Sequence, residues 1–417
     1  MAVTQNKFSY TNCTRTHGHI FSRQWATAKP VLAGDPDGAS ARAGDGGGHY
    51  PGKMRFLQVG LGHRSPGLRR VGADLPNLSC AGVVLHRPVR TAAEPVFTDL
   101  AAALERTRPD FVLCLARPGS TPAVVTQCVA AGVPVLAEAP LAAGAAGAEQ
   151  LAGLADTGLV QVIEPYPWLP DQAAALAAVR AGLIGQVGQV QLSGLPAHGA
   201  MALLQAYLGP AEPVAVRLAR FPAESGQPTV LGQPMALGQP VTLGRPGPTH
   251  RTGPGWPDEP LVATVEFAGG AIGVYAPRVP GRTSSQTDSA TGSATAATTP
   301  STHPRPFLVR GTAGEIVGRV LTRLDDPAKV STWRFQRTYA QPADGAGPRL
   351  ASIHLADTTV WSNPQPDQDW SDAEIAGGAI LRAMMAFVRG EGPGPYGLAE
   401  ALADTRLVLA IGQALGG

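Results

Sequence analysis

The chain has 417 residues, of which 44% are hydrophobic and 15% are charged, and its formal net charge is +2. This length is long for one domain and sufficient for two, and the hydrophobic fraction allows a sizeable core. The small net charge gives no reason to expect nucleic acid as a partner, and no apolar run reaches the roughly 18 residues of a membrane span.

The cysteines and lysines limit the metal-binding and catalytic roles that the chain can have. The four cysteines form neither a CxxC pair nor a metal-ligand spacing, so we expect no metal, and we expect Cys114 and Cys128 to lie in the core. The chain lacks the charged-then-apolar start of a secretory signal, which favours a cytoplasmic setting. Of only four lysines, Lys329 is the one beyond residue 53, and it lies in a charged, turn-like segment where we expect no catalytic role.

Residues 1–53 are predicted to be a disordered N-terminal extension. The part from 33 to 52 is rich in Gly, Asp, Pro and Ala and has few large apolar residues, so it cannot offset the entropy of ordering. A targeting peptide and a start site at Met54 are the alternatives.

From Met54 the pattern alternates between short apolar runs and helix-like segments. Strands are predicted at 55–59, 81–86, 96–98, 110–116, 134–138 and 159–164, and helices at 65–75, 100–107, 122–131 and 142–154. Alternation at this spacing is typical of βαβ units, so residues 54–165 are predicted to form a Rossmann domain, a doubly wound parallel sheet.

Residues 166–417 are predicted to form a second, α+β domain with an open, mostly antiparallel sheet. Helices are predicted at 170–181 and 200–208, and strands at 187–193, 214–220, 261–267, 271–275, 307–309, 315–320, 352–356 and 358–361. Flexible insertions are expected at 222–258, which holds a short LGQP-type tandem, and at 281–305, which is rich in Ser, Thr and Ala. Ser371 and Glu374 form a capping-box pattern ahead of the first of two C-terminal helices.

The strongest local motif is the segment GLGHRS, which follows the first predicted strand. Gly60 allows a tight turn, Gly62 allows the backbone to approach a pyrophosphate, and Ser65 is small enough for the third position. With Arg64, these residues are predicted to bind a nicotinamide dinucleotide at the start of a helix.

The end of the second strand bears on the choice of nucleotide. An acid there bonds the ribose of NAD, whereas this chain has His86 and Arg87. Arg87 could pair with a 2′-phosphate, so NADP is slightly favoured over NAD. The other predicted contacts with the cofactor follow the fourth and fifth strands and are Ala116, Arg117, Pro118, Glu138 and Ala139.

Several segments resemble the Gfo/Idh/MocA oxidoreductases, the glucose–fructose oxidoreductase and inositol dehydrogenase group. They are VGLGHRS, RPDFVLCLARPGSTPAVVTQCVAAGVPVLAEAPLA, AAVRAGLIGQVGQV, VRGTAGEI and YGLAEALADTRLVLAIGQAL, in the order of that family. The resemblance covers the chain from about Met54 to the end, apart from the two insertions. It implies a Rossmann domain, a sheet domain that shapes a site for a small, sugar-like substrate, and a possible homo-oligomer.

The chain departs from that family at its catalytic positions. The family has Glu-Lys-Pro where this chain has Glu138-Ala139-Pro140, and an alanine cannot transfer a proton. Met201 and Gln205 stand where polar catalytic residues are expected. His198 is therefore the best remaining general acid or base, and Tyr166 is a second candidate proton donor.

Three functions fit these observations. The first is an NAD(P)-dependent oxidoreductase that transfers hydride to or from a small sugar-like, carbonyl or imine substrate, for which the missing lysine matters least if the substrate is an imine. The second is a catalytically degenerate relative that binds dinucleotide or sugar as a sensor or subunit. The third retains the cofactor for a reaction with no net redox change.

Overall fold

The computed structural model describes residues 53–62, 64–87, 94–209, 212–220, 229–236, 261–277, 307–326, 329–342, 345 and 347–416. All of them belong to one compact unit, Ala41–Gly417. The predicted N-terminal extension lies outside the described residues, apart from Lys53, and so does His63 of the glycine motif. Within the described residues, no helix is long and apolar enough to cross a membrane.

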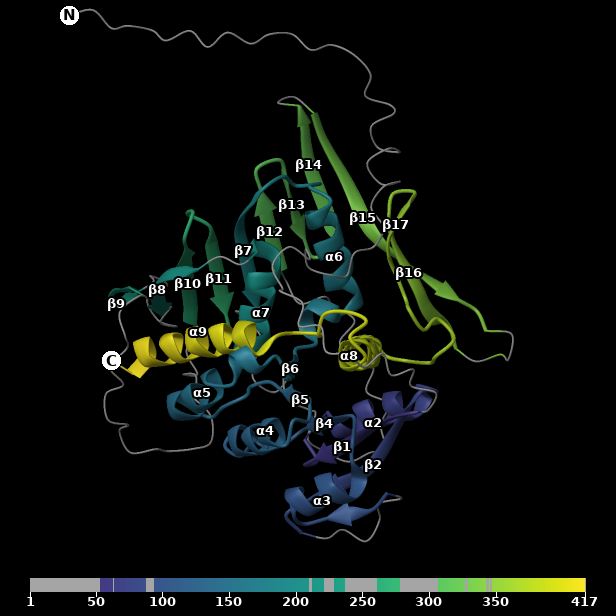
Figure 1. The fold of residues 1–417 in the computed structure, drawn as a ribbon. Coiled ribbons are helices and arrows are strands. Elements are labelled where there is room, and N and C mark those ends of the chain that lie inside the picture. Colours follow the sequence, from purple (N-terminus) through teal and green to yellow (C-terminus); the bar gives the residue numbers. More distant parts are fainter. Residues whose placement is uncertain are drawn as a thin grey trace, which may run out of the picture. The chain divides into compact units, whose positions relative to one another are not determined.

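Sheet A consists of six parallel strands in the order β3-β2-β1-β4-β5-β6 (Figure 1). Its strands are β1 (Met54–Val59), β2 (Leu78–Val84), β3 (Val96–Phe97), β4 (Phe111–Cys114), β5 (Val135–Glu138) and β6 (Val160–Ile163). The strand order reverses between β1 and β4, which is the order of a dinucleotide-binding sheet. The predicted parallel, doubly wound sheet is confirmed.

Both faces of sheet A are buried, which explains why its strands are almost continuously apolar. One face carries α3 (Leu100–Thr107), α4 (Thr121–Ala130), α5 (Ala145–Ala152) and α9 (Leu398–Gly416). The other carries α2 (Ser65–Asp74) and α8 (Asp372–Val388). Cys114 and Cys128 are fully buried in the first of these cores, as predicted.

Sheet B has eleven strands among the described residues, and all neighbours except β7 and β11 pair antiparallel. Its order is β17-β16-β15-β14-β13-β12-β7-β11-β10-β8-β9. The strands are β7 (Val187–Ser193), β8 (Pro213–Arg220), β9 (Thr229–Ala236), β10 (Leu261–Phe267), β11 (Ile272–Ala276), β12 (Phe307–Gly311), β13 (Gly314–Val317), β14 (Val320–Asp326), β15 (Lys329–Ala340), β16 (Arg349–Leu355) and β17 (Thr358–Ser362). Helices α6 (Pro170–Arg180) and α7 (Ala197–Leu208) contact this sheet, and so does α9. The predicted α+β architecture with an open, mostly antiparallel sheet is confirmed.

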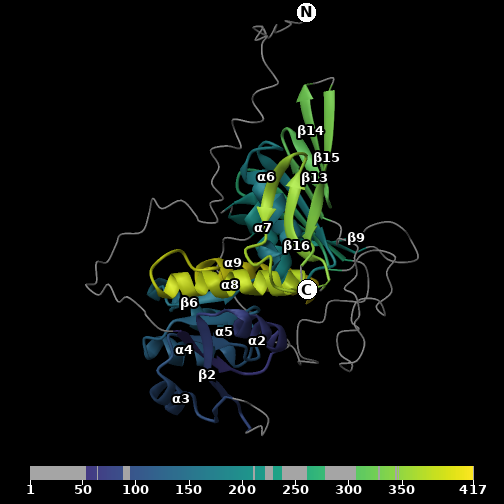
Figure 2. The ribbon, with the colours of Figure 1, turned by 90° about the vertical axis from the view of Figure 1, so that its right-hand side faces the viewer.

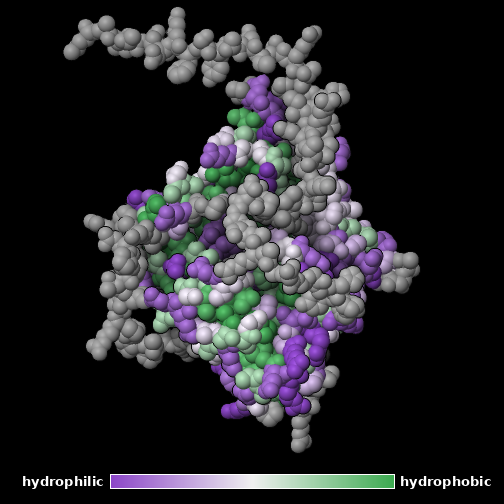
Figure 3. All heavy atoms as spheres, viewed as in Figure 1, coloured by the Kyte–Doolittle hydropathy of each residue, from purple (hydrophilic) through white to green (hydrophobic). Residues whose placement is uncertain are grey.

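Three features of sheet B differ from the sequence prediction. The span 315–320 is not one strand, because the chain turns at Gly318, with φ of +56°, and continues as β14. Neither β14 beyond residue 320 nor β15 was predicted, because both alternate exposed polar residues with few buried ones, and the end of their hairpin is hydrophilic (Figure 3). Part of the insertion predicted at 222–258 is also ordered, since β9 pairs with β8. Residues 221–228, 237–260 and 278–306 lie outside the described part.

The C-terminal helices join the two sheets, and in Figures 1 and 2 they lie between them. Helix α8 contacts α2 and α6, and α9 contacts α5, β6, α7 and β8. The predicted capping box at the start of α8 is present, with Ser371 accepting from the backbone of Glu374 and the Glu374 side chain accepting in return. The division at residue 165/166 stays a prediction, since α8 and α9 complete the core of the first domain as well as contacting the second.

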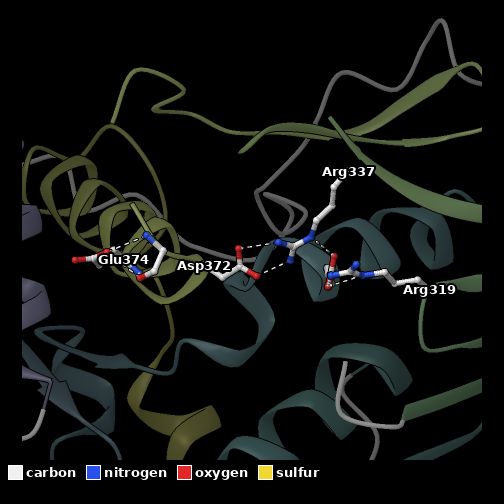
Figure 4. A network of polar contacts seen from close by, with 6 residues as sticks. Arg319, Arg337, Asp372 and Glu374 are labelled. Carbon is white, nitrogen blue, oxygen red and sulfur yellow. Dashed lines mark hydrogen bonds and ion pairs between the residues drawn. The ribbon is translucent and has the colours of Figure 1, made fainter. Parts of the chain in front are cut away.

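An ion-pair network fixes the start of α8 to sheet B (Figure 4). Arg337 of β15 donates to both Asp171 of α6 and Asp372 of α8, and Arg319 donates to the same Asp171. Burial alone would lower the pKa of Arg337, but the hydrogen bonds and charges of Asp372 and Asp171 raise it overall. A side chain only 13% exposed therefore holds two carboxylates together.

We predict that Arg337→Met destabilises the protein because it leaves Asp171 and Asp372 without their shared cation. The expected loss in the free energy of unfolding is about 2 kcal/mol, below the value for a fully buried pair because Asp372 is partly exposed. Chemical denaturation would measure it. Arg334→Met, the same change at an exposed position of β15, serves as control, with an expected effect below about 0.5 kcal/mol. Equal losses in the two variants would contradict the prediction.

Candidate active site

The glycine turn after β1 is wedged between neighbouring strand ends. Gly60 has φ of +84°, and its N–H donates to the carbonyl of Val84, at the end of β2, at 3.0 Å. A Cβ at Gly60 would lie 2.7 Å from the carbonyl oxygen of Leu115, which follows β4. Both the left-handed backbone and the close approach require glycine here, as the motif predicts. The turn thus sits where the strand order reverses.

A buried glutamine connects this turn to the helix that follows it. The amide nitrogen of Gln58 donates to the carbonyl of Gly60 at 2.8 Å and to the hydroxyl of Ser65 at 2.9 Å. Helix α2 begins at Ser65 with no acidic residue in its first turn and no side-chain cap. No acid of the helix's own first turn therefore offsets the positive end of its dipole, which suits a phosphate.

Glu138 and Arg64 form an ion pair directly beside the second glycine. The Nε of Arg64 lies 3.1 Å from Oε1 of Glu138, and the two side chains are 21% and 8% exposed. A Cβ at Gly62 would lie 2.7 Å from the other carboxylate oxygen, Oε2 of Glu138. Two residues predicted from separate motifs are thereby brought together at one place.

The remaining predicted cofactor residues lie along the same edge of sheet A. Ala116 backs the glycine turn, since its Cα would lie 3.1 Å from a Cβ at Gly60, and the exposed Arg117 and half-buried Pro118 follow it. His86 and Arg87 are exposed and follow β2, on the other side of β1. The structure therefore divides the predicted residues between the two halves of the sheet.

Ala139 takes the place of the expected lysine and has an apolar role. Its side chain packs against the core on the α3–α4–α5–α9 face. Met201 is fully buried in α7. Gln205 donates its amide to Asp404 of α9 at 2.6 Å. Ala139 and Met201 are thus apolar, and the amide of Gln205 is hydrogen-bonded to the carboxyl group of Asp404.

The two predicted catalytic residues come from adjoining elements. Tyr166 begins the short helix η2 (Tyr166–Trp168) after β6, and its ring lies on the backbone of Gly199, where a Cβ would be 2.1 Å from Cδ2. His198, the residue before Gly199, is half-buried at the start of α7. The structure therefore brings Tyr166 next to the backbone that carries His198.

Glu164 is a buried acid that the sequence analysis did not select. It follows β6, is 2% exposed, and accepts a hydrogen bond from the backbone N–H of Tyr166 at 3.4 Å. Burial raises the pKa of Glu164 to about 7, although this hydrogen bond and the charge of Arg64 oppose the shift. A carboxyl group with this pKa can hold or release a proton near neutrality.

A second buried acid, Asp404, adjoins Glu164. It accepts from the hydroxyl of Tyr396 at 2.7 Å in addition to the amide of Gln205. Burial raises the pKa of Asp404 well above its ordinary value, the hydrogen bond from Tyr396 opposes this, and the charges of Glu164 and Glu400 add to it. Acids from β6 and α9 are therefore electrostatically coupled. For Glu164 the available signal was an acid ending an apolar strand, whereas Asp404 has no comparable local signal.

No family model matches the sequence, and no curated protein matches it. Solved structures do match its fold. An oxidoreductase from Agrobacterium radiobacter, solved with NAD+, L-tartaric acid and magnesium, is 16% identical, with a TM-score of 0.56 over 88% of this chain and 97% of that one. The WlbA dehydrogenase from Bordetella pertussis, solved with NADH and UDP-GlcNAcA, is 15% identical, with a TM-score of 0.54 over 87% and 96% of the two chains.

A third similar structure is the scyllo-inositol dehydrogenase of Lactobacillus casei, which is 13% identical, with a TM-score of 0.55 over 87% of this chain and 96% of that one. These similar structures are oxidoreductases of the Gfo/Idh/MocA type. Nearly all of each of these three chains is matched. The chain therefore has the two-domain fold of the Gfo/Idh/MocA oxidoreductases, as its motifs predicted.

Proposed function

We propose that this protein is an NAD(P)-dependent oxidoreductase that transfers hydride to or from a small sugar-like, carbonyl or imine substrate. The observation that carries the proposal is the glycine turn at the reversal of the strand order, where open α/β sheets bind nucleotides. The similar structures solved with NAD+ or NADH support the same cofactor class.

The residues present fit a dinucleotide. Side-chain atoms at Gly60 and Gly62 would fill the space beside Leu115 and Glu138, and the first turn of α2 contains no acidic residue. Gly60, Gly62, Ser65 and the backbone of Arg64 would hold the pyrophosphate, and Arg87 and His86 the adenosine side, with NADP favoured because the end of β2 lacks an acid. Ala116, Arg117 and Pro118 would line the other half. The nicotinamide supplies a hydride donor or acceptor when bound.

Proton transfer falls to groups other than the missing lysine. We assign catalytic roles to His198 and Tyr166, and we add Glu164, whose pKa of about 7 suits a general acid. The backbone N–H of Tyr166 orients Glu164. The hydrogen bond from Gln205 to Asp404 joins α7 to α9, and the hydroxyl of Tyr396 donates to the same Asp404.

The replacement of the lysine by Ala139 favours the alternative of a non-catalytic dinucleotide-binding relative. Such a protein would bind the cofactor and turn nothing over. Turnover by the wild-type protein decides between the two functions.

We predict that the wild type binds NADPH more tightly than NADH, and that Arg87→Glu removes this preference. The variant should lose about 10- to 100-fold in NADPH affinity, because a phosphate contact contributes roughly 1.5–3 kcal/mol, and should keep its NADH affinity. Fluorescence titration of the reduced nucleotides would measure both, with Arg334→Glu on β15 as the matched control. Absence of any affinity of the wild type for either nucleotide would refute the proposed function.

We predict that His198→Ala lowers kcat by about 10²–10⁴, the usual contribution of a general acid or base. Nucleotide affinity should stay within about threefold, because His198 lies on α7 and not on the glycine turn. Turnover and fluorescence titration on the same preparations separate the two effects. Unchanged turnover would show that His198 is not catalytic.

We predict that Glu164 makes the protein less stable as the pH rises. Its pKa is raised in the folded state, so its contribution is fully present below about pH 4.5 and is lost as the pH rises towards 7. Glu164→Gln should therefore match the wild type near pH 4.5 and exceed it near pH 8, by on the order of 3 kcal/mol. Arg64, Asp404, Tyr396 and Glu400 are the charged and titratable groups around this site.

Thermal unfolding across this pH range would measure the difference, with Glu105→Gln at an exposed position of α3 as control. A constant difference between Glu164→Gln and the wild type at all pH values would show that Glu164 does not titrate in this window.

A further inference from the structure

The edge of sheet A that carries the glycine turn contains no lysine among the described residues. Lys53 precedes β1 and is exposed at the opposite end of that strand, and Lys329 is exposed at the start of β15. Arg64 is the cation that buried carboxylates hold at this edge. It is ion-paired with Glu138, the residue immediately before Ala139, and its charge acts on Glu164.

Arg64 reaches toward one particular half of the sheet. Its backbone belongs to the turn after β1, whereas its ion-pair partner Glu138 ends β5, and Glu164, on which its charge acts, follows β6. His86 and Arg87, the predicted adenosine contacts, lie on the other side, after β2. In doubly wound sheets each half holds one mononucleotide, so Arg64 lies on the half that receives the nicotinamide and the substrate.

The chemistry of this half requires a positive charge. In a reduction the substrate carbon gains a hydride, its oxygen gains the electron pair of the C=O π bond, and a proton from a nearby acid completes the hydroxyl group. A fixed cation beside that oxygen stabilises the charge that develops there. An arginine cannot supply the proton, because its guanidinium stays charged, but its five N–H donors match oxygen acceptors well.

We propose that Arg64 is a catalytic residue that donates hydrogen bonds to the oxygen on the reacting carbon of the substrate, in place of a lysine at position 139, with Glu138 as its positioning residue. The inference rests on the proposed function and deepens it. The substrate class it implies is a ketone or secondary alcohol bearing further oxygen groups. Glu164 holds the proton that the guanidinium cannot transfer.

Binding of L-tartrate to the protein saturated with NAD+ tests this assignment without turnover, using isothermal titration calorimetry. Tartrate is a hydroxy acid that occurs together with NAD+ in a structure of the same fold. Arg64→Met should weaken tartrate binding at least tenfold more than it weakens NAD+ binding, because the substitution keeps the backbone N–H of residue 64 in the glycine turn.

Two further variants control for misfolding of Arg64→Met and for a general effect of removing an arginine. Arg64→Met combined with Glu138→Gln removes both charges of the ion pair, so it should fold even if Arg64→Met alone does not, and it should show the same loss. Arg55→Met, at an exposed position of β1, is the matched control and should bind tartrate as the wild type does.

Equal tartrate affinity in the wild type and the Arg64 variants, whether all bind or none binds, would overturn the inference. A parallel loss of NAD+ and tartrate affinity would also overturn it, because Arg64 would then hold the cofactor. Either result leaves the proposed function intact if the wild type binds the dinucleotide. Failure of the wild type to bind NAD+ and NADP+ would overturn both.

Discussion

The approach of the glycine turn to the carbonyl of Leu115 is the constraint on which the site depends. The turn passes so close to the ends of β2 and β4 that a side chain at Gly60 would strike backbone atoms. This closeness sets the direction of α2, and Gln58 then fixes the helix start through Ser65. Because β1 is bordered by β2 on one side and β4 on the other, the same contact places the helix end at the strand-order reversal.

Much of sheet A could be predicted from the sequence because its strands are buried on both faces. Apolar runs such as 111–115 contain nothing that favours exposure, and every residue of this run is buried. Sheet B was harder. In β15 an exposed residue alternates with a half-buried one along most of its length, so the strand has no apolar run, and its existence depends on pairing with β14 and β16. Pairing between distant segments leaves little trace in local composition.

In the candidate site too, contacts between residues far apart in the sequence could not be predicted. The glycine turn was predictable because the close approach of the backbone restricts the residue type at positions 60 and 62. The pairing of Arg64 with Glu138 joins residues 74 positions apart, and Asp404 meets Gln205 across 199 positions. Nothing in the sequence near Glu164 indicates its burial among other acids. The contacts of Asp404 arise only when α9 lies against β6 and α7.

The place of α8 and α9 has a consequence for biosynthesis. The core on one face of sheet A includes Ile375, Ile380 and Met384 of α8, and the core on the other face includes Leu398 and Leu402 of α9. A nascent chain that has emerged only as far as β6 therefore exposes apolar strand faces that its own helices do not fully cover. At a synthesis rate of about 5–20 residues per second, the ribosome needs on the order of ten seconds or more to supply the missing helices. Over that interval the first domain depends on later sequence, which favours post-translational completion of its core and recognition by chaperones.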